Sequence, residues 1–200
     1  MPPQLYVYER ELELWTSNDA QRFFEAHGFD VSVFPIDQLN ERWLPTDHLF
    51  LDNTTKKLFG FQYKALYHNG ADFWKIDERQ HAELQGYDWI YYGLSEMTSG
   101  RQSRDALNRL VIVPASFVYD SRLARDQFVQ LGIPHFRWDS FYDGLVRCKY
   151  GRRVNSSQQL KDALWPSGVD VPYQIERIAN DVFVVDVANE NVAMFSSARR

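Results

Sequence analysis

The stretch Pro45–Leu66 reads Pro-Thr-Asp-His-Leu-Phe-Leu-Asp-Asn-Thr-Thr-Lys-Lys-Leu-Phe-Gly-Phe-Gln-Tyr-Lys-Ala-Leu. Two apolar runs, His48–Leu51 and Leu58–Leu66, flank the polar segment Asp52–Lys57. Apolar runs separated by a few polar residues predict a β-hairpin. The rest of the chain contains further strand-like and helix-like segments, so this hairpin is expected at the centre of an α/β fold, with a central mixed sheet flanked by helices.

The second strand of this hairpin carries two polar side chains. Because side chains alternate along a strand, Gln62 and Lys64 should point to one face, and Phe61 and Tyr63 to the other. Burying an amide and an ammonium without partners is costly, so these groups either reach water or serve a site. Asp47 opens the preceding strand and would lie across from them. The arrangement predicts a divalent-metal site beside a cation.

Asp47, followed after fourteen residues by Gln62-Tyr63-Lys64, resembles the signature of the PD-(D/E)XK nuclease superfamily, which has the restriction-endonuclease-like fold. In that family the Asp and an acidic residue of the second strand bind Mg²⁺, and the Lys assists the attacking water. Here Pro45-Thr46-Asp47 stands where Pro-Asp is expected, and Gln62 replaces the usual acid. The resemblance implies Mg²⁺ or Mn²⁺ held by Asp47, the Gln62 side chain and the Tyr63 carbonyl. A neutral Gln predicts weaker binding than a second carboxylate would give.

The order of the predicted elements also resembles that family, whose core runs helix, strand, hairpin, helix, strand. The elements expected around the hairpin are a helix starting at residues 16–19 and stopped by Gly28, a strand over 29–36, a helix over 77–85 and a strand over 89–94. Residues 5–15 fit either a strand or an early helical turn. The resemblance covers roughly residues 18–97, under half of the chain.

In that fold the first helix often carries another acidic residue that faces the metal. Asp19 is one candidate and Glu25 another, whereas Glu13 qualifies only if the helix begins earlier than expected. The alternative role for Asp19 is a capping acid that interacts with the helix dipole. Asp52 is a reserve ligand, but five residues beyond Asp47 it should point to the opposite face of a regular strand.

Two further regions are candidates for contacts with nucleic acid. In the helix after the hairpin, Gln80 and Leu84 resemble a Gln-then-Leu pattern of the family, so Gln80 would contact a phosphate or hold the Lys. The second region is the basic run around Tyr150, whose cations are Arg147, Lys149, Arg152 and Arg153. These suit phosphate contacts, with Tyr150 stacking on a base. The alternative is a solvated helix end whose cations complement the helix dipole.

Composition limits the possible classes of protein. The chain has 200 residues, 44% of them hydrophobic, a formal charge of −5 and one cysteine, Cys148. A single cysteine excludes an internal disulfide and a cysteine zinc site. No apolar run approaches the roughly 18 residues that span a membrane, and no signal peptide is evident, so a cytoplasmic protein without a membrane partner is expected. The charge argues against a broadly basic surface but leaves room for a local basic groove.

The chain is expected to divide into a nuclease-like core, residues 1–97, and a C-terminal α/β extension, residues 98–200, which either continues the same sheet or is separate from it. The loop Ser95–Ser103 either closes over a substrate or links the two halves. Beyond it we expect a strand over 109–113, a helix over 121–131, a strand over 133–138 and a helix over 141–149, with the strands adding to the sheet in parallel. A last helix over 156–164 and a hairpin over 171–178 and 182–187 follow.

Three functions from different classes remain open. The first is a metal-dependent nuclease that hydrolyses DNA phosphodiester bonds. The second is a nucleic-acid-binding module that keeps the fold but has lost cleavage, a loss that Gln62 makes possible. The third is a structural or interaction subunit, with a protein partner or a second copy, which the acidic net charge favours. Metal-dependent cleavage separates the first from the others, and salt-dependent binding separates the second from the third.

Overall fold

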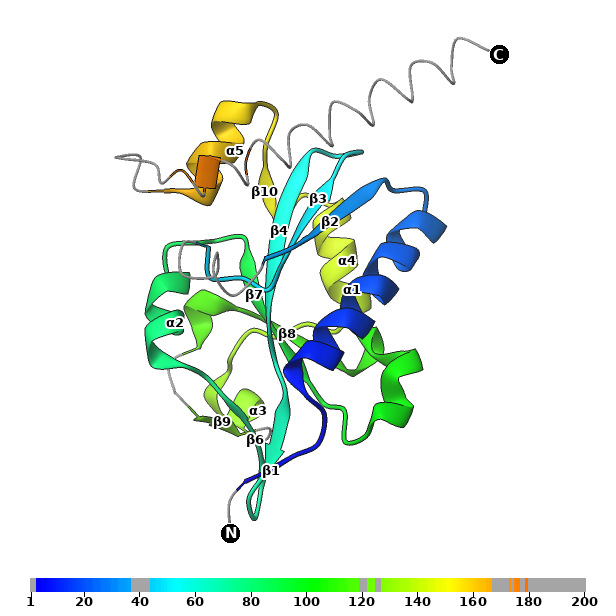
Figure 1. Cartoon of the computed structure of the whole chain (residues 1–200), viewed down its shortest axis with the longest axis vertical. Helices are drawn as coiled ribbons and strands as arrows, with labels where there is room; N and C mark the ends of the chain where they lie inside the picture. The colour runs from blue at the N-terminus through cyan, green and yellow to red at the C-terminus, as the bar shows by residue number, and fades with distance from the viewer. Residues whose placement is uncertain are drawn as a thin grey trace.

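The structure is a computed structural model that describes residues 3–36, 44–118, 122–124 and 127–166, together with Tyr173, Ile175, Glu176 and Ala179. It is a mixed α/β fold with a central sheet flanked by helices, which confirms the predicted fold class (Figure 1). In chain order the elements are β1 (Gln4–Leu5), α1 (Glu9–Ala26), β2 (Val31–Pro35), β3 (His48–Asp52), β4 (Lys57–Lys64), β5 (Leu66–His68), β6 (Asp72–Lys75), α2 (Glu78–Leu84), β7 (Ile90–Ser95), η1 (Gly100–Asp105), η2 (Leu107–Arg109), β8 (Leu110–Pro114), η3 (Ala115–Phe117), β9 (Arg122–Ala124), α3 (Gln127–Leu131), α4 (Trp138–Val146), β10 (Arg152–Arg153) and α5 (Ser157–Leu164), where η denotes a 3-10 helix.

The central sheet has the strand order β2-β3-β4-β7-β8, and β10 pairs with the start of β4. β2, β3 and β4 are antiparallel neighbours, and β7 then pairs with β4 in parallel. A parallel neighbour needs a crossover, which β5, β6 and α2 provide between β4 and β7. The helix, strand, hairpin, helix, strand order is therefore present, with two extra strands inserted before α2.

Helices cover both faces of this sheet (Figure 1). Phe61 and Tyr63 pack on one face with residues of α1 and α4, including Leu12 and Phe141. Residues of the other face pack with α2 and α5 in a second cluster. Every residue of β4 is buried, because β4 lies between β3 and β7 and has helices on both faces. The polar residues of β4 are therefore enclosed by the core.

α1 begins at Glu9, with Tyr8 as N-cap, so the predicted helix start at residues 16–19 is wrong. Thr16 and Ser17 lie within the helix, where their hydroxyls donate to the carbonyls one turn back instead of capping. The buried positions of α1, at four-residue intervals, include Leu12 and Thr16. Because α1 begins at Glu9, Glu13 lies within the helix. This is the condition under which Glu13 was a candidate for the helix acid that faces the metal.

The second half of the chain differs from its predicted elements. The helix expected over 121–131 is replaced by the strand β9 and the shorter helix α3. The strand expected over 133–138 is reduced to one bridge between Phe136 and Ile112, and β8 pairs with β7 in antiparallel rather than parallel orientation. The first strand of the predicted C-terminal hairpin was expected over 171–178. The residues described there, Tyr173, Ile175 and Glu176, are helical instead. The second strand lies outside the described residues.

A smaller sheet, with the order β1-β5-β6-β9, continues from the end of β4 through Ala65. Figure 1 shows β1, β6 and β9 together near the N-terminal end of the molecule, far from α5. Leu66, Trp74 and Leu123, which are partners across this sheet, belong to the core. Within the described ranges, no helix has both the length and the apolar character needed to cross a membrane.

Candidate functional site

The hairpin brings Asp47 against the second half of β4. Its Oδ1 accepts a hydrogen bond of 2.7 Å from Nε2 of Gln62, and its Oδ2 accepts one of 2.6 Å from the main-chain N–H of Tyr63. Asp47 is 6% exposed and Gln62 is 3% exposed. A carboxylate this close to a strand of the core is held in one orientation by its two donors.

Local contacts explain why Asp47 occupies this position. The Asp47 N–H donates to the carbonyl of Phe61 at 3.0 Å, which extends the pairing of β3 and β4 by one residue. The Thr46 hydroxyl lies 2.9 Å from the same carbonyl. Gly60 makes room for it, since a Cβ at Gly60 would lie 2.9 Å from Thr46 Oγ1. The Thr-Asp pair before β3 is therefore locked onto β4.

Lys64 meets an acid that the sequence patterns did not single out. Its Nζ lies 3.9 Å from Oε2 of Glu9, and the other oxygen of Glu9 accepts a hydrogen bond of 3.3 Å from the Ala65 N–H. The Lys64 side chain is only 8% exposed, whereas the Glu9 side chain is 37% exposed, so the ion pair is shielded from solvent on the Lys64 side only. The acidic residues Glu9, Glu11 and Glu13 at the start of α1 could have indicated a partner for Lys64. They were not considered as partners because the helix was predicted to start after them.

Glu13 also lies near the site, one turn further along α1. Burial raises the pKa of the Tyr63 phenol, a hydrogen bond between Tyr63 and Thr16 lowers it, and the charges of Asp47 and Glu13 raise it further. Both carboxylates are thus within electrostatic range of the same hydroxyl. Glu9 and Glu13 are the acids that α1 presents to this part of β4.

Asp19 lies elsewhere on α1. Burial raises its pKa, the charge of Arg22 lowers it, and the charge of Asp105 raises it. These neighbours belong to α1 itself and to η1. Asp19 therefore faces the 3-10 segments rather than the contacts of Asp47. The reserve ligand Asp52 is also engaged elsewhere, because it accepts hydrogen bonds from the main chain and side chain of the β3–β4 turn, including the Thr54 N–H at 2.9 Å.

The oxygens around Asp47 are of the type that divalent cations bind. Gln62 Oε1 is buried and has no hydrogen-bond partner within the described part of the chain, which leaves an acceptor beside the Asp47 carboxylate. The N–H and C=O of one strand residue point to the same edge, so the Tyr63 carbonyl faces the side on which Asp47 binds its N–H. No cluster of three or more His, Cys, Asp or Glu that could hold a metal occurs among the described residues.

Comparison of this chain with protein-family models, curated proteins and solved structures gives no match. The site is therefore interpreted from its own geometry.

α2 packs beside the site through Tyr92, which is the partner of Gln62 across β4 and β7. The Tyr92 hydroxyl lies 3.1 Å from Nδ1 of His81, and burial lowers the pKa of His81. Gln80 contributes its main-chain N–H, which donates to the α2 cap Asp77 at 2.9 Å. Its side chain makes no hydrogen bond to a described residue, so the structure gives the Gln80 amide no contact with Lys64.

The basic run lies at the opposite end of β4 from Asp47. Of its four predicted nucleic-acid contacts, Arg147 and Lys149 follow the end of α4, and Arg152 and Arg153 form β10. β10 pairs with Lys57 and Leu58, and Gln62 lies four residues further along β4, about 13 Å at the rise of a strand. Arg147 pairs with Asp143 at 2.8 Å, and Arg152 lies 3.8 Å from Asp88. The run and the Asp47 site are two separate regions.

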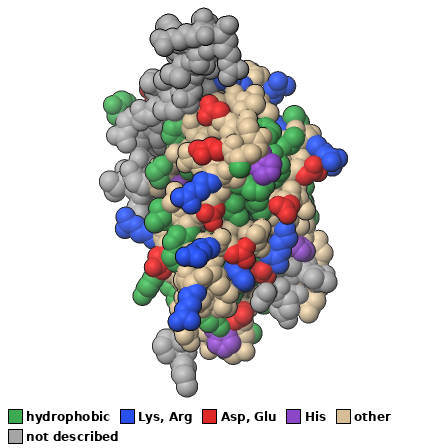
Figure 2. Space-filling model, turned by 90° about the vertical axis from the view of Figure 1, so that its right-hand side faces the viewer, with side chains coloured by type: hydrophobic (Ala, Val, Ile, Leu, Met, Phe, Trp, Pro, Cys, Tyr) green, Lys and Arg blue, Asp and Glu red, His purple; other side chains and the backbone are tan. Residues whose placement is uncertain are grey.

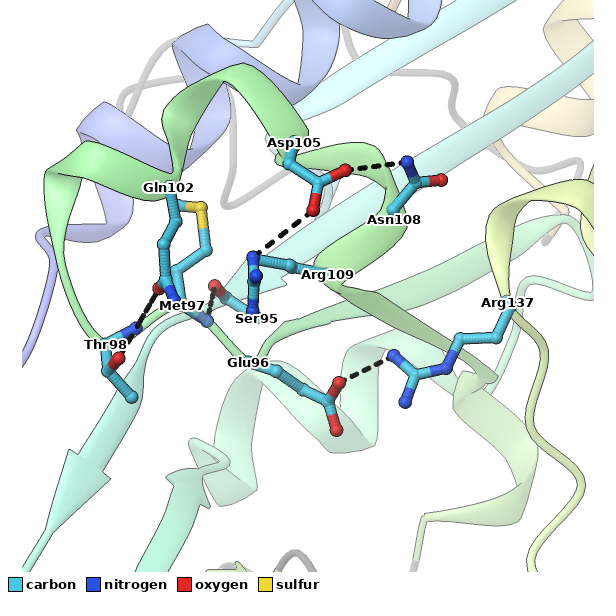
Figure 3. Close-up of polar contacts among 9 residues, drawn as sticks. All are labelled: Ser95, Glu96, Met97, Thr98, Gln102, Asp105, Asn108, Arg109 and Arg137. Carbon is cyan, nitrogen blue, oxygen red and sulfur yellow. Dashed lines mark hydrogen bonds and ion pairs between the residues drawn. The ribbon is translucent and has the colours of Figure 1, made fainter.

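The predicted loop after β7 is held by hydrogen bonds (Figure 3). The Thr98 N–H donates to Gln102 at 2.7 Å, and Met97 N–H donates to the Ser95 hydroxyl at 3.1 Å. η1 occupies most of the remaining loop. These contacts fit a fixed link between β7 and β8.

Ion pairs flank this loop. Glu96 pairs with Arg137 at 2.6 Å, and Asp105 pairs with Arg109 at 3.5 Å (Figure 3). Figure 2 shows the side of the molecule that carries α1, where Lys and Arg alternate with Asp and Glu. A face of mixed sign offers no broad attraction to a phosphate backbone, so a nucleic-acid contact on this face would be local.

Proposed function

We propose that this chain is a Mg²⁺- or Mn²⁺-dependent nuclease that hydrolyses DNA phosphodiester bonds with a site of the PD-(D/E)XK type. The observation that carries the proposal is the Asp47 carboxylate bound to both Gln62 and the Tyr63 N–H, beside an unpartnered Gln62 oxygen. The order α1, β2, β3, β4, α2, β7, with Lys64 two residues after Gln62, supports it. The same proposal includes a cytoplasmic location.

Each residue has a distinct role in this proposal. A bound divalent ion would lower the pKa of an attacking water and offset charge that develops on the phosphate. Asp47, Gln62 and the Tyr63 carbonyl would hold that ion. Lys64, oriented by Glu9, would donate a hydrogen bond to a phosphate oxygen as its charge grows. Because Lys64 is buried and paired with Glu9, its position is set before a substrate arrives.

A second candidate is a nucleic-acid-binding module without cleavage. Both oxygens of Asp47 already accept hydrogen bonds, and the residue is 6% exposed. In this alternative the Asp47 contacts serve only to join β3 to β4. Gln62, in place of an acid, then marks a site that keeps its shape without holding a metal.

The test is cleavage of single-stranded, duplex and branched DNA with Mg²⁺ or Mn²⁺. We expect wild-type protein to cut, and Asp47→Asn and Lys64→Met each to lose at least about 100-fold in rate. The matched controls are Asp52→Asn, which changes a buried acid at the other end of β3, and Lys161→Met on α5. Both should retain activity if they fold.

Three other results would redirect the interpretation. Equal cleavage by wild type, Asp47→Asn and Lys64→Met would place the site elsewhere or reveal a contaminant. Salt-dependent DNA binding without cleavage would favour the binding module. Neither cleavage nor binding would leave the structural or interaction role.

A further inference from the structure

The smaller sheet has an outer face whose composition differs from its core face. Leu66, Trp74 and Leu123 point into the core. Because side chains alternate along strands, the residues next to them in sequence point to the outer face. They are Tyr67, Phe73, Lys75, Arg122 and Ala124. Two aromatic rings and two cations thus lie on one short sheet.

Contacts join these side chains into one surface. The rings of Tyr67 and Phe73 are stacked, with centroids 5.7 Å apart and an interplanar angle of 26°. The Arg122 guanidinium lies over Phe73, 3.7 Å from the ring centroid. Phe73 is 6% exposed beneath this layer, whereas Lys75 and Arg122 are exposed and Tyr67 is partly exposed. Phe73 is the support, and Tyr67, Arg122 and Lys75 form the accessible layer.

This surface adjoins the candidate site. β5 begins directly after Ala65, whose N–H is bound by Glu9, and Glu9 also pairs with Lys64. Burial raises the pKa of the Tyr67 phenol, and the charge of Glu9 raises it further, so Tyr67 lies near the same carboxylate. Tyr67 is three residues beyond Lys64, at most about 11 Å along the extended chain.

We propose that Tyr67, Arg122 and Lys75 form a platform for single-stranded nucleic acid that leads to the Lys64 end of the site. Bases stack on aromatic rings, and lysines and arginines contact the phosphates between them. Duplex DNA is a poor ligand for this layer, because its bases are already stacked on each other. The proposal deepens the proposed function, on which it rests for the identity of the substrate.

The test measures binding of fluorescent oligo-dT, oligo-U and duplex DNA in EDTA, so that cleavage plays no part. We expect wild type to bind both single strands more tightly than duplex. Tyr67→Leu should weaken single-strand binding by at least about fivefold, because one stacked base is lost. Lys75→Gln with Arg122→Gln should reduce the salt slope by about 1.4 for two lost phosphate contacts. The matched control is Arg79→Gln with Lys161→Gln, at an exposed position of α2 and a partly exposed position of α5, which should leave the slope unchanged.

Crosslinking locates the contact directly. An oligonucleotide with 5-iodouracil should crosslink on irradiation to the peptide that contains Tyr67. A crosslink at Tyr150 instead, or unchanged binding by Tyr67→Leu, would overturn the platform. Equal competition by base-free polyphosphate would overturn base stacking as well. Cleavage of duplex alone by wild type would refute the platform yet retain the nuclease, whereas platform binding without any cleavage would refute only the nuclease.

Discussion

Replacing Asp47 should reveal how strongly it joins β3 to β4. Asp47→Ala removes the acceptor of two hydrogen bonds, of 2.7 and 2.6 Å, and leaves the donors on Gln62 and Tyr63 buried. A hydrogen bond to a charged group contributes about 1.5–3 kcal/mol, so the loss of both should lower the free energy of unfolding by about 3–6 kcal/mol.

Asp47→Asn should cost far less, about 1 kcal/mol. Its oxygen can accept from the Tyr63 N–H, and its NH₂ group can donate to Oε1 of Gln62 if the Gln62 amide turns over. The unpartnered oxygen of Gln62 then gains a donor. Asp47→Asn is therefore the variant to use in activity assays, because it separates loss of charge from loss of structure.

Urea unfolding followed by circular dichroism measures both values, with wild type and Asp88→Ala beside them. The Asp88 side chain is 80% exposed, so its removal should change stability by no more than about 0.5 kcal/mol. The reasoning is refuted if Asp47→Ala costs less than about 1 kcal/mol, or if Asp47→Asn costs as much as Asp47→Ala.

Three further outcomes follow from the same structure. Gln62→Glu places a second buried carboxylate beside that of Asp47, so in metal-free buffer it should lower the free energy of unfolding by about 1–3 kcal/mol. Mn²⁺ should restore the stability of this variant. An unfolding midpoint that does not change with Mn²⁺ would contradict the metal site. Burial lowers the pKa of His48 to about 4 from 6.5. The neutral His48 side chain therefore contributes fully to stability above pH about 6.5, and this contribution falls by up to about 3 kcal/mol as the pH approaches 4. His48→Gln should flatten that decline, and identical pH profiles of unfolding free energy for wild type and His48→Gln would disprove the assignment. Gly93→Ala would place a Cβ 2.7 Å from Tyr63 Cδ1 and should cost about 1–3 kcal/mol, whereas Gly86→Ala, whose Cβ would meet its nearest atom at 3.9 Å, should cost little by the same unfolding measurement.

Much of the local structure could be predicted from neighbouring residues alone. The hairpin of β3 and β4 follows from apolar runs around a polar turn, and Asp52 binds the turn N–H groups, as short polar side chains do. The caps of α2 and α5 are Asp77 and Ser156, each accepting from an N–H three residues on. The approach of Asp47 to Gln62 can also be predicted from nearby residues, because the register of the hairpin determines it.

The remaining features depend on contacts between segments far apart in sequence. The start of α1 was misplaced because Thr16 and Ser17 resemble caps, yet burial of Leu12 against the sheet extends the helix back to Glu9. That packing brings Glu9 to Lys64, 55 residues away. The separation of the basic run from Asp47 likewise depends on where β10 joins β4.

The sequence by itself determined the hairpin, the starts of α2 and α5 and the polar pair on β4, because turn chemistry, capping and side-chain alternation act within a few residues. Only the tertiary structure decided which acid of α1 reaches Lys64, that β7 lies parallel to β4, and that Tyr67 and Arg122 flank Phe73 on one face. The physical reason is that burial of apolar surface is non-directional and sums over the whole core. Helix limits and strand neighbours therefore follow the packing that buries the most surface, which no local pattern records.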